Sequence, residues 1–143
     1  MTSRFDHPRE SPGFLLWRVT LAWQRAMRNA LAPHDLTHVQ YVLLASTWWL
    51  AEHEGPPSQQ RLAAQAGTDP MMTSQVLRKL EGRGLVSREA DPSDARARLL
   101  GVTQSGRALL TGAMADVERA DAEFFAALDE DQHAFASALA RLT

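Results

Sequence analysis

Apolar residues in the first third of this chain recur every three or four positions, the spacing of one face of an α-helix. The first such stretch opens at Ser11-Pro12, where a serine N-cap precedes a proline suited to the first helical position. The second opens at Thr37, with Gln40 three residues further on, which is the pattern of a capping box. The sequence therefore predicts two long helices, over about 11–32 and 37–54.

Two short helices are predicted next, with only a few residues between them. Ser58 caps the first, which runs over 59–66 and is closed by Gly67. Asp69-Pro70 opens the second, which ends near Gly82. Two short helices this close together cannot pack as a long antiparallel pair, so they indicate a helix-turn-helix.

The pattern then changes to that of β-strands. The segments 85–90 and 97–103 have strand-like content, and the turn-forming residues Asp91-Pro92-Ser93-Asp94 separate them. A two-stranded hairpin directly after a helix-turn-helix is a wing.

Two more helices complete the predicted fold. Thr103 caps a long helix whose apolar residues form a narrow seam, which Asp121 interrupts. Asp129, followed by Gln132, opens a terminal helix. The seam residues are Leu110, Met114, Val117, Phe124 and Leu128.

The predicted fold is mainly α with a small β-hairpin wing, in one domain over 1–143. A winged helix-turn-helix core is expected over about 36–103. The helices over about 11–32 and 104–143 have more apolar surface than this small core can cover, so we expect them to form a homodimer.

Composition narrows the class of protein. With 143 residues, 45% of them apolar and 22% charged, the chain has the size and balance of one ordinary globular domain. No apolar run approaches the roughly 18 residues of a membrane span, and the polar start MTSRFDHPRE lacks a secretory core, so we expect a cytoplasmic protein without membrane contact. The absence of cysteine excludes disulfides, thiolate metal sites and thiol redox switches.

Neither catalysis nor metal binding is indicated. The sequence has no GxSxG, no phosphate-binding GxxxxGK[ST], no GxGxxG after a strand and no HExxH. Two clusters hold potential ligands: His34, Asp35 and His38, and Glu52, His53 and Glu54. Each lacks a further well-spaced His or Cys, so solvated or structural roles are favoured. We expect no enzyme, no cofactor and no metal.

Charge is distributed unevenly. The net charge of the chain is −2, yet the segment 58–107 holds eight Lys or Arg against five Asp or Glu. A basic middle between acidic flanks fits one DNA-facing surface on an otherwise acidic body.

The stretch 84–106 resembles the MarR family of bacterial transcription regulators, whose mark is GLV…D-x-R…LT-x-x-G. Gly84-Leu85-Val86, Asp94-Ala95-Arg96 and Val102-Thr103-Gln104-Ser105-Gly106 occupy those places, with Val102 where Leu is usual. Leu62-Ala63 and Leu80-Glu81-Gly82-Arg83-Gly84 also match, whereas Arg61 stands where the family has Glu. The resemblance covers nearly the whole chain and implies a ligand-responsive repressor that binds a pseudo-palindromic double-stranded DNA operator as a homodimer.

The second short helix is the expected recognition helix in the major groove. The spacing turns Met72, Val76, Leu77 and Leu80 inward and leaves Met71, Thr73, Ser74, Gln75 and Arg78 exposed as candidate DNA contacts. On the wing, the resemblance implies that Arg96 enters the minor groove and that Asp94 steadies it. Arg88 and Arg98 are candidate phosphate contacts. The alternatives are an ordinary solvated helix face and a surface salt bridge of little energetic value.

The resemblance also implies a small aromatic or phenolic effector. Candidate residues that offer stacking surfaces and a cation for a carboxylate are Trp17, Arg18, His38, Tyr41 and Trp48. Aromatic residues at helical spacing also occur in cores and dimer interfaces, which is the alternative reading of this set. Two other functions remain open: a winged-helix protein-interaction module, and a helical small-molecule-binding protein without DNA binding.

Overall fold

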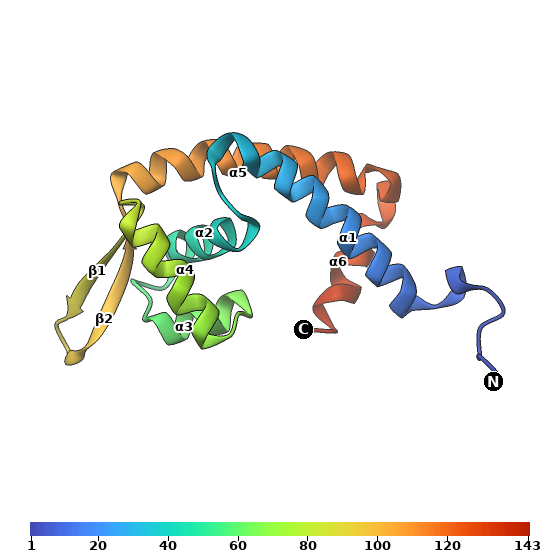
Figure 1. The fold of residues 1–143 in the computed structure, drawn as a ribbon, viewed down its shortest axis with the longest axis horizontal. Helices are drawn as coiled ribbons and strands as arrows, with labels where there is room; N and C mark the ends of the chain where they lie inside the picture. The colour runs from blue at the N-terminus through green and yellow to red at the C-terminus, as the bar shows by residue number, and fades with distance from the viewer.

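The computed structural model describes residues 1–143 and confirms the predicted order of helices and hairpin (Figure 1). The α-helices are α1 (Pro12–Leu31), α2 (His38–His53), α3 (Gln59–Ala66), α4 (Pro70–Gly82), α5 (Gln104–Phe125) and α6 (Gln132–Ala140). The strands β1 (Val86–Asp91) and β2 (Asp94–Val102) pair antiparallel. Short 3-10 segments are η1 (Pro8–Glu10), η2 (Ala32–His34) and η3 (Ala126–Asp131).

Five of the six α-helices begin at the N-cap that the sequence predicts. Ser11, Ser58, Asp69 and Thr103 each accept a hydrogen bond from a backbone amide of the first helical turn. Thr37 and Gln40 form the reciprocal capping box at the start of α2, with bonds of 3.0 and 3.2 Å. These starts depend only on residues within one helical turn, which is why the sequence alone locates them.

The predicted start of the last helix is wrong. Asp129 has a φ of +45° inside η3 and caps nothing, and α6 begins after Asp131. The reason is the packing of aromatic rings at this end of the molecule, because α5 stops at Phe125 and the chain turns back until the Phe135 ring lies 5.9 Å from that of Phe125. Leu128 therefore lies in η3 and not in the seam of the long helix.

The hydrophobic core joins the C-terminal half of α1 to the helix-turn-helix, the hairpin and most of α5. Its buried residues are Met27, Leu31, Leu36, Leu43, Leu44, Leu50, Leu62, Leu77, Leu80, Leu85, Val86, Leu100, Leu110, Ala113 and Val117. Helices α1 and α5 run antiparallel, since the Trp23 indole N–H donates to Asp121 at 2.7 Å and His34 Nε2 lies 2.6 Å from Asp116. Asp121 thus interrupts the apolar seam because it holds the Trp23 indole.

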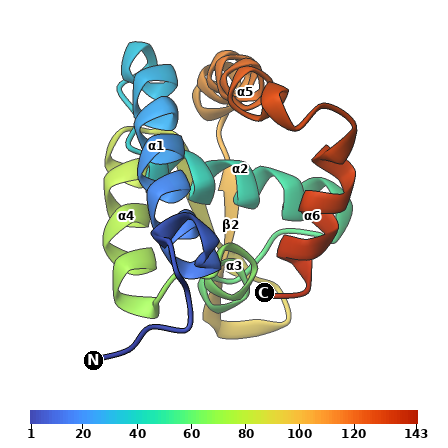
Figure 2. The same ribbon diagram turned by 90° about the vertical axis from the view of Figure 1, so that its right-hand side faces the viewer.

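The N-terminal half of α1 and all of α6 contribute nothing to that core. In Figure 1, α5 spans the molecule, with the helix-turn-helix and hairpin below one half and α6 below the other; Figure 2 looks nearly along α5, with α1 and α6 on opposite sides of the view. Large apolar side chains stay exposed on these two helices and just after α6: Phe14, Leu15, Leu16, Trp17, Val19, Leu21, Leu139 and Leu142. We call this set the apolar face. None of the helices combines the length and apolar character needed to cross a membrane.

Candidate nucleic-acid interface

Helix α4 presents a mixed polar and apolar surface to solvent. Asp69 caps its first turn by accepting from the Met72 amide at 2.8 Å, while Leu77 and Leu80 are fully buried against the core. Met71, Gln75 and Arg78 are exposed, as predicted. Ser74 is half-buried, and its hydroxyl lies 3.4 Å from Arg78 Nη2. One side of α4 is therefore free to meet a partner.

Two residues in the first turn of α4 face the opposite way from the prediction. Thr73 is fully buried, and Met72 is 42% exposed. The Thr73 hydroxyl donates to the Asp69 carbonyl at 2.8 Å and lies 2.7 Å from the Thr68 hydroxyl. Because its polar atom is satisfied inside the turn, Thr73 can be buried at little cost. The prediction that Thr73 is an exposed DNA contact is wrong.

The wing carries two exposed arginines. Arg96 and Arg98 lie on β2, and no carboxylate forms an ion pair with either. Asp94 accepts from the backbone amide of Arg96 at 2.9 Å, so it holds the turn and not the guanidinium. Asp91 accepts from the amide and hydroxyl of Ser93, and these bonds lower the pKa of its carboxyl. Two Asp turns thus shape the tip of the wing.

Arg88, unlike Arg96 and Arg98 on the hairpin, forms an ion pair within the protein. Its Nε donates to Glu81 of α4 at 2.9 Å and its Nη1 to Gln59 of α3 at 3.1 Å. Arg88 is half-buried in this position. The side chain therefore ties β1 to both helices of the helix-turn-helix.

The N-terminal end of α4 and the tip of the wing lie on one side of the molecule, away from α5 (Figure 1). The cations on this side, Arg78, Arg96 and Arg98, have no carboxylate partner. On α5, by contrast, Arg107 pairs with Glu52 at 2.6 Å, and Arg119 pairs with Asp116. Unneutralised arginines beside a presented helix form a surface suited to a polyanion.

An open cavity of about 690 Å³ lies between α1, α2 and the turn that leads into α4. Its lining residues are Gln24, Arg28, Ala32, Leu36, Thr37, His38, Val39, Val42, Ala66 and Thr68. Arg28 supplies a cation, and the first turn of α2 adds the positive end of a helix dipole. The cavity therefore suits a small ligand with an apolar body and a negative group.

His38 is the one predicted effector residue in this cavity. Its ring meets that of Trp23 edge-on, with centroids 5.0 Å apart. Burial lowers the pKa of His38 below its ordinary 6.5, Asp121 opposes this shift, and Arg28 adds to it. His38 is therefore held in the neutral form at neutral pH.

The other predicted effector residues lie elsewhere in the chain. Tyr41 is half-buried, and burial together with Glu118 and Asp121 raises the pKa of its phenol. Trp48 lines a smaller cavity of about 260 Å³ beside α5. Trp17 and Arg18 lie on the uncovered half of α1. The sequence analysis did not name Gln24 and Arg28, which line the cavity beside His38. Their spacing of four residues places them on the same face of α1, and this is the signal that could have identified them.

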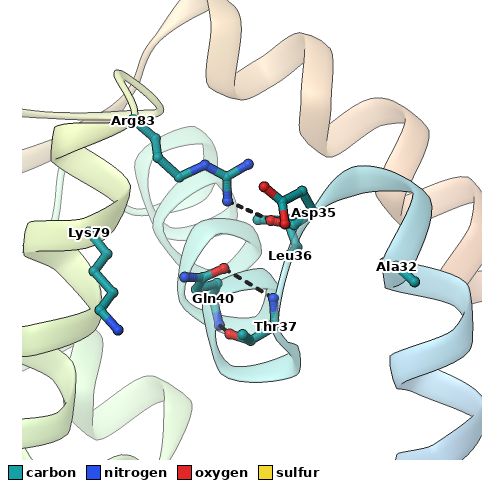
Figure 3. A pocket seen from close by; sticks show the side chains of 7 residues that line it. All are labelled: Ala32, Asp35, Leu36, Thr37, Gln40, Lys79 and Arg83. Atoms are coloured by element: carbon teal, nitrogen blue, oxygen red, sulfur yellow. Dashed lines mark hydrogen bonds between the residues drawn. The ribbon is translucent and has the colours of Figure 1, made fainter.

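A second cleft of about 560 Å³ separates the start of α2 from the C-terminal half of α4 (Figure 3). Arg83 bridges it by donating to the carbonyl of Asp35 at 2.7 Å, and Asp35 has a φ of +50° in the loop between α1 and α2. Leu36 and Thr37 line both this cleft and the cavity described above. The junction of α1 and α2 therefore lies between that cavity and α4.

Fold and surface together define a winged helix-turn-helix protein. A model of the MarR family matches residues 36–97. The chain is 46% identical over 125 residues to the HTH-type transcriptional regulator YdcH of Bacillus subtilis, covering 87% of this chain and 85% of that one. This chain belongs to the MarR family of transcriptional regulators.

Two solved structures extend the likeness. The transcriptional repressor CouR, bound to a 23-mer DNA duplex, superposes with a TM-score of 0.85 at 29% identity over 99% of each chain. The MarR-family protein Rv2887 of Mycobacterium tuberculosis, in complex with salicylic acid, gives a TM-score of 0.70 at 36% identity. That match covers 93% of this chain and 96% of the other.

Proposed function

We propose that this protein is a ligand-responsive repressor that binds a pseudo-palindromic operator as a homodimer. The observation that carries the proposal is the unpaired arginines Arg78, Arg96 and Arg98 beside the exposed side of α4. Gln75 and Arg78 are suited to adenine and guanine edges in the major groove, and Arg96 and Arg98 to the minor groove and phosphates. The DNA-bound likeness of CouR supports this assignment.

The apolar face of α1 and α6 is the proposed dimer surface, and the chain acts as a single domain over 1–143. Eight large apolar side chains left in water at the two ends of the chain favour a partner with the same surface. Two-fold symmetry would place the two α4 helices on half-sites about one turn of DNA apart. The proposed role belongs to the cytoplasm and requires no catalytic step and no cofactor.

The proposed effector is a small aromatic carboxylate held in the cavity between α1 and α2. Arg28 would pair with the carboxylate, and His38, whose ring Trp23 meets edge-on, would contact the ligand ring. A ligand that prefers one spacing of the two DNA-binding lobes shifts the dimer toward that spacing. The Arg83–Asp35 bond couples the cavity side of the α1–α2 junction to α4. The salicylic acid complex of Rv2887 supports this class of ligand.

The test is a titration of a fluorescent duplex carrying the promoter region upstream of the protein's own gene. A scrambled duplex serves as the control, at two salt concentrations, with and without salicylate. We expect sequence-selective, salt-dependent binding with two protomers per site, weakened by salicylate. Equal, weak binding to both duplexes would contradict the proposal and favour a protein-interaction module. Selective binding that salicylate leaves unchanged would contradict only the effector assignment.

A further inference from the structure

The exposed methionines of this protein are concentrated on the proposed DNA-contacting helix. Met71 is 71% exposed and Met72 is 42% exposed, side by side in the first turn of α4. Met27 is fully buried, Met114 is half-buried, and the only other exposed methionine is the first residue of the chain. No other large apolar side chain on α3, α4 or the hairpin is exposed to this degree.

Neither the core nor the proposed dimer surface accounts for these two side chains. Both are exposed to solvent, whereas Leu77 and Leu80 of the same helix are fully buried, and α4 is remote from the N-terminal half of α1 and from α6 (Figure 1). They share the exposed side of α4 with Gln75. In the major groove, apolar side chains contact the C5-methyl group of thymine. This placement suits both thioethers to a dry contact with the operator.

A thioether in this position has a second chemical property. The chain has no cysteine, so methionine sulfur is the one side-chain sulfur that a peroxide can oxidise. In that reaction a sulfur lone pair attacks one oxygen of hydrogen peroxide, an S–O bond forms and the O–O bond breaks. The displaced hydroxide takes up a proton and leaves as water, so the sulfur loses two electrons and the peroxide gains them. The product is methionine sulfoxide.

We propose that Met71 and Met72 form an oxidation-sensitive contact, so that peroxide-class oxidants release this protein from its operator. The inference rests on the proposed DNA-binding function. A sulfoxide oxygen is a strong hydrogen-bond acceptor, and pressing it against a methyl group removes its water without offering a donor. Two-fold symmetry repeats the loss in each half-site. Methionine sulfoxide reductases would restore the contact, because sulfoxidation is reversible.

The experiment compares the affinity of the protein for the promoter duplex before and after treatment with hydrogen peroxide. Tryptic peptide mapping follows each site separately, because Met71 and Met72 fall in peptide 62–78 and Met114 falls in peptide 108–119. We expect full conversion of Met71 and Met72 to weaken binding by about tenfold or more, and reductases of both epimer specificities to reverse the loss. Unchanged affinity after full conversion would overturn the inference.

Two variants locate the effect. For the double variant Met71→Leu/Met72→Leu, we measure the affinity for the promoter duplex after peroxide treatment and divide it by the affinity before treatment. We expect this ratio to remain near one, because leucine does not form a sulfoxide. Met114→Leu, changed outside the proposed interface, should lose affinity on treatment as the parent does. An equal loss in the double variant would overturn the assignment to Met71 and Met72.

Protection of the methionines of the parent protein from peroxide by bound duplex provides a test that needs no variant. The bound duplex should slow oxidation of peptide 62–78 and leave peptide 108–119 unaffected, and equal oxidation with and without duplex would also overturn the assignment. If the untreated protein does not bind the duplex at all, the proposed function itself fails. If it binds but oxidation has no effect, the oxidation-sensitive contact alone fails.

Discussion

Two surfaces of this chain are left uncovered, and they differ in chemistry. The apolar face on α1 and α6 exposes Leu16 and Trp17 among its eight large side chains. The surface formed by α4 and the wing exposes arginines without carboxylate partners, among them Arg96. The first surface gains free energy by leaving water, whereas the second gains it by releasing the counterions of a polyanion.

The difference assigns each surface a partner of a different kind. The proposed partner of the apolar face is a second copy of the chain, which carries the same apolar surface. The proposed partner of the cationic surface is a DNA groove lined with phosphates and base edges, which suits its arginines and the exposed amide and thioether groups of α4. The core connects the two, because α1 is half in the core and half in the apolar face.

The largest expected effect comes from a charge on the apolar face. Leu16→Glu should convert the dimer to a monomer in analytical ultracentrifugation, because a buried leucine contributes about 1.5–3 kcal/mol and the two-fold axis repeats the loss. Gln65→Glu, a charge added on α3, should leave the mass unchanged. A variant that stays dimeric would show that α1 is not the dimer surface.

Next in size is the loss of one unpaired arginine from the wing. Arg96→Ala should weaken operator binding by roughly tenfold to a hundredfold and flatten its salt dependence. Arg107→Ala removes the same charge from α5, where Glu52 already neutralises it, and serves as the control. Equal losses in both variants would point to net charge and not to a wing contact.

The amide of Gln75 should set the base preference at one base pair of the half-site. Gln75→Ala should remove about 1–3 kcal/mol of base preference at a single position of the half-site. The measurement is binding to a series of duplexes in which each base pair is changed in turn, with Gln132→Ala on α6 as the control. If Gln75→Ala lowered the base preference equally at every position of the half-site, direct readout of one base by Gln75 would be contradicted.

Thr73 tests the division of α4 into buried and exposed sides. Thr73→Val should lower the free energy of unfolding by about 1 kcal/mol, because the bonds of the hydroxyl to Asp69 and Thr68 are lost. Urea unfolding provides the measurement, and Ser74→Ala is the matched control. A variant as stable as the parent would mean that the buried hydroxyl contributes nothing.

The smallest effect concerns pH. Because burial lowers the pKa of His38 in the folded protein, the unfolded chain binds its proton more readily. The contribution of His38 to stability is therefore complete above pH 6.5 and declines as the pH falls below that value. His38→Gln should lose less thermal stability than the parent between pH 7.5 and pH 5.5, approximately the range over which histidine titrates. An identical decline in both proteins would exclude His38 as a source of the pH dependence.

The sequence by itself determined the order of the elements and the starts of five helices. Those starts depend on contacts within one turn, as in the Thr37–Gln40 capping box. The exposed position of Gln75 was also predicted correctly, because helical spacing places it on the outward side of α4. The same local rules indicated the wing through Asp91-Pro92-Ser93-Asp94, although β2 begins at Asp94, before the predicted start.

Only the tertiary structure decided how side chains are paired across the chain. It buried Thr73 and exposed Met72, bound Arg88 to Glu81 and Gln59, and brought Arg28 and His38 to one cavity. It also moved the start of α6 past Asp129 by packing Phe135 against Phe125. The physical reason is the range of the interactions. A cap is complete within four residues, whereas burial, ion pairing and cavity shape depend on neighbours that the fold brings from distant parts of the sequence.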